Sequence, residues 1–169
     1  MSYENVPLGS KIYDDLVKTL RESFPNACVL YIDKIVNQHL VDRFEQRKNY
    51  LESTEYGSNE MILYHGTTEI SANLISKEGY KSSLNKRSVY GPGTYFSSAG
   101  SYSKLYTDVT GRGESFMLVN RVLLGNFTKN AGIGYTCDSN GDGSTIFVVK
   151  NDESILPEYV ICFHKNAKN

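Results

Sequence analysis

Residues 91–108 read GPGTYFSSAGSYSKLYTD, and this stretch decides the fold assignment. Gly91 and Gly93 predict a tight backbone path that leads into a short strand at 94–97 and then a helix at 98–108. The stretch is not a dinucleotide-binding fingerprint, because the third glycine of that motif is missing and a strand follows the glycines. Taken alone, the glycines also fit the entry to an ordinary β-hairpin.

Two side chains of the expected helix at 98–108 are candidates for ligand binding. Ser103 and Tyr106 are three residues apart, so they share one helix face. A hydroxyl and an aromatic ring on one face suit a flat ring that bears an amide. The plainer alternative is a mixed helix with Leu105 facing inward and the rest in water.

Upstream, residues 61–67 read MILYHGT and predict a short apolar strand. His65 and Gly66 stand at the end of this strand. A histidine there can direct a ring nitrogen outward, and the glycine lets a ligand approach the backbone closely. A surface histidine before a turn is the alternative for such a pair in isolation.

A helix is expected to follow over residues 67–80. Thr68 is its expected N-cap and Gly79 its expected end. The apolar residues Ile70, Leu74 and Ile75 are expected to face inward.

The rest of the chain places helices early and strands late. The apolar spacing predicts helices over residues 10–24 and 37–53. Runs rich in β-branched residues predict strands over residues 27–36, 115–125, 144–150 and 159–165. This order argues for an α+β fold with a mainly antiparallel sheet and against a doubly wound one. Residues 1–169 are expected to form a single domain.

Composition excludes several classes of protein. The net charge of −1 argues against an obligate nucleic acid partner, and no apolar stretch is long enough to span a membrane. The N-terminus lacks the features of a secretory signal, so an intracellular location is expected, cytoplasmic or nuclear. Three cysteines lack the spacing of a disulfide framework or a zinc site, and Cys28 and Cys162 are expected in the core.

Residues 138–143 read DSNGDG and match the first half of a calcium-binding EF-hand loop. The match fails at its twelfth position, Val149, where a glutamate is needed, and a strand follows instead of a helix. A turn with solvated acidic side chains is therefore expected, and no metal.

These blocks, in this order, resemble the catalytic domain of the poly(ADP-ribose) polymerase (PARP) family. The resemblance covers most of the chain and also includes residues 31–48 and 144–161, YIDKIVNQHLVDRFEQRK and STIFVVKNDESILPEYVI. It implies the ADP-ribosyltransferase fold, a split and mainly antiparallel sheet with flanking helices. It also implies NAD+ as co-substrate and protein side chains as acceptors. The protein is expected to be a monomer.

The resemblance also implies a role for each motif residue. Gly66 would hold the nicotinamide carboxamide through its backbone, with the Ser103 hydroxyl on the same amide. Tyr106 would stack on the nicotinamide ring, with Tyr95 on the other wall. His65 would hydrogen-bond the adenine-side ribose, and Thr67 follows the pattern of a second ribose contact.

One position departs from the polymerising members. They carry a glutamate thirteen residues before the tyrosine of the last strand, and counting back from Tyr159 reaches Ile146. The resemblance therefore implies a catalytic triad of His65, Tyr95 and Ile146. Breaking the bond between nicotinamide and ribose builds positive charge on the ribose, which a carboxylate stabilises and isoleucine does not. The sequence thus predicts a mono-ADP-ribosyltransferase. A catalytically silent module that binds NAD+ or ADP-ribose is the alternative, and a pure interaction module is a third possibility.

Overall fold

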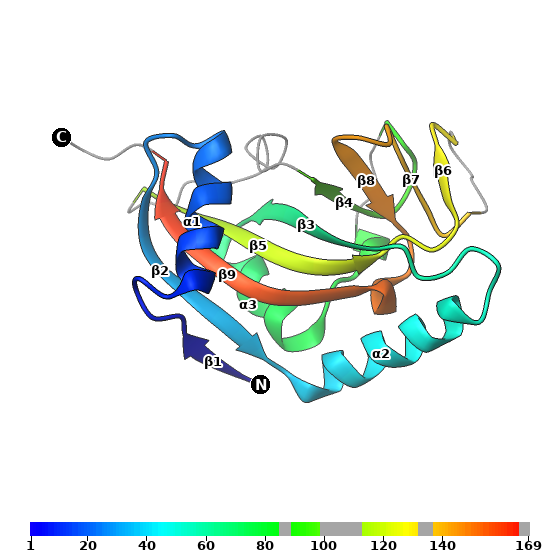
Figure 1. Cartoon of the computed structure of the whole chain (residues 1–169), viewed down its shortest axis with the longest axis horizontal. Coiled ribbons are helices and arrows are strands. Elements are labelled where there is room, and N and C mark those ends of the chain that lie inside the picture. Colours follow the sequence, from blue (N-terminus) through cyan, green and yellow to red (C-terminus); the bar gives the residue numbers. More distant parts are fainter. Residues whose placement is uncertain (85–88, 99–112, 132–136, 166–169) are drawn as a thin grey trace.

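The computed structural model describes residues 1–84, 89–98, 113–131 and 137–165. These residues form one nine-stranded sheet and three α-helices, so the expected α+β class is confirmed (Figure 1). The helices are α1 (Lys11–Ser23), α2 (Gln38–Glu52) and α3 (Glu69–Glu78), with two short 3-10 turns, η1 (Ser82–Leu84) and η2 (Asp152–Ser154). The strands are β1 (Ser2–Asn5), β2 (Cys28–Val36), β3 (Glu60–Thr67), β4 (Thr94–Ser97), β5 (Glu114–Leu123), β6 (Phe127–Lys129), β7 (Ser139–Gly141), β8 (Ile146–Val149) and β9 (Ile155–His164).

The sheet is split, as the resemblance implies. Its order is β1-β2-β9-β5-β3-β4-β8-β7-β6, and every pairing except β6 with β7 is antiparallel. β3 pairs with β5 from Glu60 to Thr67 but meets β4 at a single position, Tyr64 opposite Ser97. Figure 1 shows β4, β8, β7 and β6 gathered beyond this junction, at one end of the long strands. The junction of β3 and β4 therefore separates two sub-sheets.

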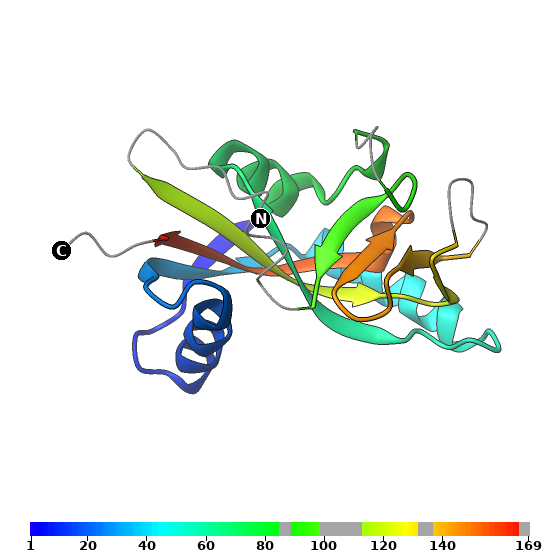
Figure 2. The same cartoon turned by 90° about the horizontal axis from the view of Figure 1, so that it is seen from above.

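Helices cover the long strands from both sides. Figure 2 shows α1 and α3 on opposite faces of the sheet. α1 begins at its N-cap Ser10, whose hydroxyl accepts a hydrogen bond from Tyr13 N at 3.2 Å. It buries Val17 and Leu20 against strand residues such as Ile161, and burial of this apolar stripe holds α1 on the sheet.

α3 has the expected ends but presents a different face. The Thr68 hydroxyl caps Ser71 N at 3.1 Å, and Gly79 ends the helix at φ +83°. Ile75 packs against the core, whereas Ile70 and Leu74 are 73% and 51% exposed, so the prediction that they face inward is wrong. The small side chains Ala72 and Ser76 are buried instead, and they allow the helix to lie close to the sheet.

Other sequence expectations have mixed outcomes. Cys162 is buried, but Cys28 is exposed, because a register shift between Val29 and Tyr31 interrupts the alternation at the start of β2. The sequence does not predict the strands β1, β6 and β7, because segments of three or four residues are too short to carry a periodic signal. Nearly all of the expected helix at 98–108 lies outside the described residues.

Candidate active site at the split of the sheet

His65 stands near the end of β3 with its ring held from several sides. Its Nδ1 lies 2.9 Å from the carbonyl oxygen of Tyr95 on β4. A carbonyl only accepts, so Nδ1 carries the hydrogen, and Nε2 of the neutral ring keeps a lone pair. Burial lowers the pKa of His65 below its ordinary value, and the hydrogen bond to Tyr95 offsets part of that shift. His65 is therefore neutral at pH 7 and offers a hydrogen-bond acceptor.

A buried network behind His65 supports its ring. Tyr80 packs edge-on against the imidazole, with ring centroids 5.4 Å apart, and Phe96 lies at 5.7 Å. The Tyr80 hydroxyl donates to Asn120 Oδ1 at 2.8 Å, and Asn120 Nδ2 donates to the carbonyls of Leu63 and Leu118, both at 3.1 Å. Asn120 is fully buried, so these bonds satisfy a side chain that would otherwise destabilise the core.

A pocket of about 400 Å³ opens beside His65. His65, Thr67 and Thr94 form its wall on the strands. The other wall comes from α3 and the segment after it, and includes Leu74, Ile75, Glu78, Tyr80 and Leu84. The pocket thus combines apolar side chains with a few polar groups, which is typical of small-molecule sites.

Tyr95 follows a turn that only glycine accommodates. A Cβ on Gly93 would lie 2.7 Å from Val148 Cγ1 and 2.8 Å from the Val149 carbonyl oxygen, at a φ of +147°. The Tyr95 hydroxyl folds back on this turn, accepting from Tyr90 N at 3.0 Å and donating to the Gly91 carbonyl at 2.9 Å. The GPG motif therefore lets β4 lie against β8 and fixes the tyrosine that follows.

Pairing of β4 with β8 brings the third triad position to Tyr95. Tyr95 lies opposite Val148, and Ser97 opposite Ile146. Opposed residues of an antiparallel pair point to the same face, and so do residues two apart along a strand. Tyr95, Ser97 and Ile146 therefore share one face, and His65 is joined to it through the Tyr95 carbonyl.

The remaining predicted contacts are Gly66, Thr67, Ser103 and Tyr106. Gly66 and Thr67 are buried residues of β3, just beyond the single bridge to β4, and Thr67 lines the pocket. Ser103 and Tyr106 lie outside the described residues. The structure thus brings His65, Gly66, Thr67, Tyr95 and Ile146 to the split of the sheet, and their roles stay predictions.

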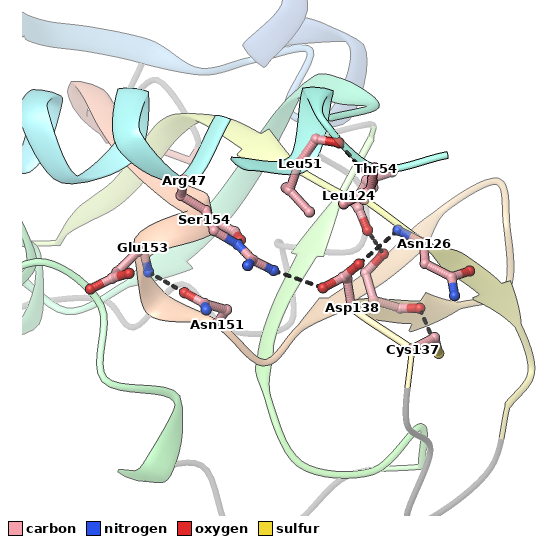
Figure 3. A network of polar contacts seen from close by, with 12 residues as sticks. Arg47, Leu51, Thr54, Leu124, Asn126, Cys137, Asp138, Asn151, Glu153 and Ser154 are labelled. Carbon is pink, nitrogen blue, oxygen red and sulfur yellow. Dashed lines mark hydrogen bonds and ion pairs between the residues drawn. The ribbon is translucent and has the colours of Figure 1, made fainter. Parts of the chain in front are cut away.

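A polar network anchors the small sub-sheet to α2 (Figure 3). Arg47 on α2 pairs with Asp138 at 2.7 Å and donates from Nε to Ser154 Oγ at 3.2 Å. Asp138 also accepts from Asn126 N at 2.9 Å. The start of β7, which pairs with the β8 strand of Ile146, is thereby fixed to the helix and to the segment before β9.

The acidic turn at 138–143 is not a solvated one. Asp138 is paired with Arg47, while Asp142 Oδ1 accepts from the backbone of Ser144, Thr145 and Ile146 at 2.7–2.9 Å. Burial by itself would raise the pKa of Asp142, but these N–H groups outweigh it and the pKa is lowered. Both carboxylates serve the turn, and no group of three or more metal-ligating side chains occurs in the described part of the chain.

Comparison with known sequences identifies the fold. The sequence model described as the poly(ADP-ribose) polymerase catalytic domain matches residues 10–142. The chain belongs to this family. The match includes β3, the GPG turn and β4, and it ends before Ile146, so the third triad position in this PARP domain rests on the counted register and on the pairing of β8.

Relatives of this PARP domain are named as protein mono-ADP-ribosyltransferases. It is 24% identical over 178 residues to human protein mono-ADP-ribosyltransferase PARP12, covering 95% of this chain and 25% of that protein. It is 25% identical over 202 residues to human PARP11, covering 96% and 60%, and 26% identical over 176 residues to mouse PARP10, covering 90% and 18%. The chain therefore spans between about a fifth and three fifths of these relatives' lengths.

The sequence analysis did not identify Tyr80 and Asn120 as supports of the candidate site. Asn120 had a usable signal, because it is a lone amide within the apolar run 116–124. Tyr80 had none, because a tyrosine just after a helix end is also common on surfaces.

Among the described helices, none is long and apolar enough to cross a lipid bilayer.

Proposed function

We propose that this chain is a mono-ADP-ribosyltransferase, which transfers one ADP-ribose unit from NAD+ to a side chain of an acceptor protein and releases nicotinamide. The observation that carries the proposal is the pairing of β4 with β8. It sets an isoleucine on the face of Tyr95, at the position where polymerising members of the family carry a glutamate.

The pocket beside His65 is proposed to take the adenosine half of NAD+. A neutral His65 supplies a lone pair at Nε2, which accepts a hydrogen bond from a ribose hydroxyl. Thr67 lines the same pocket and adds a second polar contact. The flat adenine fits the apolar wall of the pocket, to which Leu74 contributes.

The nicotinamide half is proposed to lie along Gly66 and Tyr95. The Gly66 backbone holds the carboxamide, and the Tyr95 ring forms one wall for the pyridinium ring. A cationic ring against tyrosine gains on the order of 1–2 kcal/mol when desolvated. Ser103 and Tyr106, from the segment outside the described residues, complete this half in the proposal.

In the reaction, the glycosidic carbon–nitrogen bond breaks and its electron pair goes to the pyridinium nitrogen. Nicotinamide leaves neutral, and positive charge develops on the ribose. Ile146 carries no charge to stabilise it and no base to activate a ribose hydroxyl for chain growth. A carboxylate of the acceptor protein supplies both the countercharge and the nucleophile, and one ester-linked ADP-ribose results.

The setting of this reaction is proposed to be inside the cell. Cys28, Cys137 and Cys162 are all free thiols, which fits a reducing compartment. The near-zero net charge fits a protein without an obligate nucleic acid partner. The protein is proposed to act as a monomer.

The test is transfer of label from radioactive NAD+, with and without an acidic acceptor protein, resolved on a denaturing gel. We expect discrete bands without a ladder of long chains. His65→Ala should abolish them, whereas His39→Ala, at an exposed position on α2, should leave them unchanged.

Three other outcomes of this assay would contradict the proposed function. Long chains of ADP-ribose would refute the mono-transferase proposal. Unlabelled acceptor together with a thermal shift on addition of NAD+ would favour the silent binding module. Neither labelling nor a shift would leave an interaction module.

A further inference from the structure

One wall of the pocket beside His65 continues past α3 into the segment 81–84. Lys81 and Leu84 line the pocket, yet both side chains are exposed, that of Leu84 in a residue with 76% of its surface accessible. Packing of apolar surface therefore contributes little to the position of this segment. The ion pair of Lys81 with Glu78, at 2.5 Å, is also exposed and joins the segment to the helix end next to it in sequence. The place of this wall in the fold depends on other contacts.

Ser82 makes two hydrogen bonds that fasten the segment to the body of the protein. Its backbone N–H donates to Asp152 Oδ1 at 2.8 Å, and its hydroxyl donates to the Lys150 carbonyl oxygen, also at 2.8 Å. Ser82 is partly buried, whereas the residues on either side of it are exposed. Both acceptors belong to the connection between β8 and β9, about seventy positions along the chain. The Asp152 carboxylate therefore ties the pocket wall to the strand of the third triad position.

The turn that carries Asp152 is itself anchored. η2 begins at its N-cap Asn151, whose side-chain oxygen accepts a hydrogen bond from the backbone of the turn at 2.8 Å. Ser154, at the other end of η2, is 1% exposed and accepts from Arg47 of α2 at 3.2 Å (Figure 3). Asp152 thus stands on a fixed turn, and the exposed segment around Ser82 is held against it.

We propose that Asp152 is a positioning residue for donor binding, which acts through Ser82 to hold the segment 81–84 where this wall takes the adenosine half of NAD+. This inference rests on the proposed function. A wall that is released is competent for binding only part of the time, and the apparent dissociation constant rises as the competent fraction falls. The nicotinamide half is proposed to lie along Gly66 and Tyr95. The effect should therefore fall on donor affinity and not on the rate of transfer.

The experiment compares Asp152→Ala, Asp152→Asn and Ser82→Ala with wild type. Asparagine keeps an oxygen that accepts from Ser82 N, whereas alanine removes it. Ser82→Ala removes only the bond to the Lys150 carbonyl, so it tests the same wall even if Asp152→Ala does not fold. Dissociation constants are measured by calorimetry for NAD+, ADP-ribose and nicotinamide, and the rate of transfer is measured at saturating NAD+.

Ser10→Ala is the matched control. The Ser10 hydroxyl also accepts from a backbone N–H, that of Tyr13 at 3.2 Å, but it caps α1, which lies on the opposite face of the sheet from α3 (Figure 2). Its loss should lower the melting temperature without changing any dissociation constant.

We expect Asp152→Ala and Ser82→Ala to bind NAD+ and ADP-ribose about two- to twelvefold more weakly, the equivalent of one hydrogen bond. Nicotinamide, which lacks the adenosine half, should bind as it does to wild type, and the rate of transfer at saturating NAD+ should be unchanged. Asp152→Asn should regain most of the lost affinity.

Three results would overturn the inference. ADP-ribose affinity within error of wild type in both Asp152→Ala and Ser82→Ala would show that the wall does not need these bonds. An equal loss for nicotinamide would indicate general distortion of the site. A loss in Asp152→Asn as large as in Asp152→Ala would assign the effect to the negative charge instead of the hydrogen bond with Ser82. If the wild-type protein binds neither NAD+ nor ADP-ribose, the proposed function fails together with the inference, whereas the other results leave the proposed function intact.

Discussion

Replacing Tyr80 by phenylalanine isolates one buried hydrogen bond behind His65. The change removes the hydroxyl that donates to Asn120 Oδ1 at 2.8 Å and keeps the ring that packs against His65. Asn120 is fully buried, so its oxygen is left without a donor. Such a loss costs about 1–3 kcal/mol of the free energy of unfolding, which lowers the melting temperature of a domain this size by about 2–12 °C.

The assay is urea denaturation followed by circular dichroism, with the slope m compared between proteins. An unchanged m with a lower midpoint reports a true change in stability. Tyr3→Phe is the matched control, because the Tyr3 hydroxyl also donates to an asparagine, Asn73 at 3.1 Å, but in an exposed setting. That control should change stability by less than about 0.5 kcal/mol.

The two Tyr80 variants should differ in their effect on ligand binding. Because Tyr80→Phe preserves the ring against His65, the thermal shift produced by NAD+ should remain that of wild type. Tyr80→Ala removes the ring and should reduce the shift. A Tyr80→Phe protein no less stable than Tyr3→Phe would refute the assignment of this hydrogen bond as a buried support.

Three further changes test other parts of the site. Burial lowers the pKa of His65 in the folded protein, so the unfolded chain takes up the proton at a higher pH than the folded protein does. The free energy of unfolding should therefore decline as pH falls below about 6.5, and His65→Gln should remove the histidine's share of this decline. The Michaelis constant for NAD+ should stay constant above pH 7 and rise at lower pH. Gly93→Ala should cost about 2–4 kcal/mol in urea denaturation, since the new Cβ meets β8, whereas Gly9→Ala, with open space around it, should cost about 1 kcal/mol. Arg47→Ala should cost about 1.5–3 kcal/mol, because its pair with Asp138 is largely buried, and Arg43→Ala, whose pair with Glu153 is exposed, should cost less than about 1 kcal/mol in the same assay; equal costs would contradict the anchoring role of Arg47.

Local signals in the sequence determined much of the fold. The ends of α3 were predictable because Thr68 and Gly79 act through their own backbone and the adjacent turn. The chain path at residues 91–97 was predictable for the same reason, since glycine permits backbone angles that other residues avoid. The candidate triad followed from counted spacing and from the resemblance of these blocks to one family.

Tertiary structure alone decided how these pieces face one another. Apolar spacing in α3 did not reveal that Ala72 and Ser76, rather than Ile70 and Leu74, face the sheet, because that depends on how closely the strands approach the helix. The bond between Tyr80 and Asn120 joins residues forty positions apart, and the pairing of Ser97 with Ile146 joins two strands far apart in the chain. Contacts of this kind arise only when distant segments pack together, and no local propensity encodes them. The sequence therefore predicted which residues carry the chemistry, and folding decided that Ser97 lies opposite Ile146.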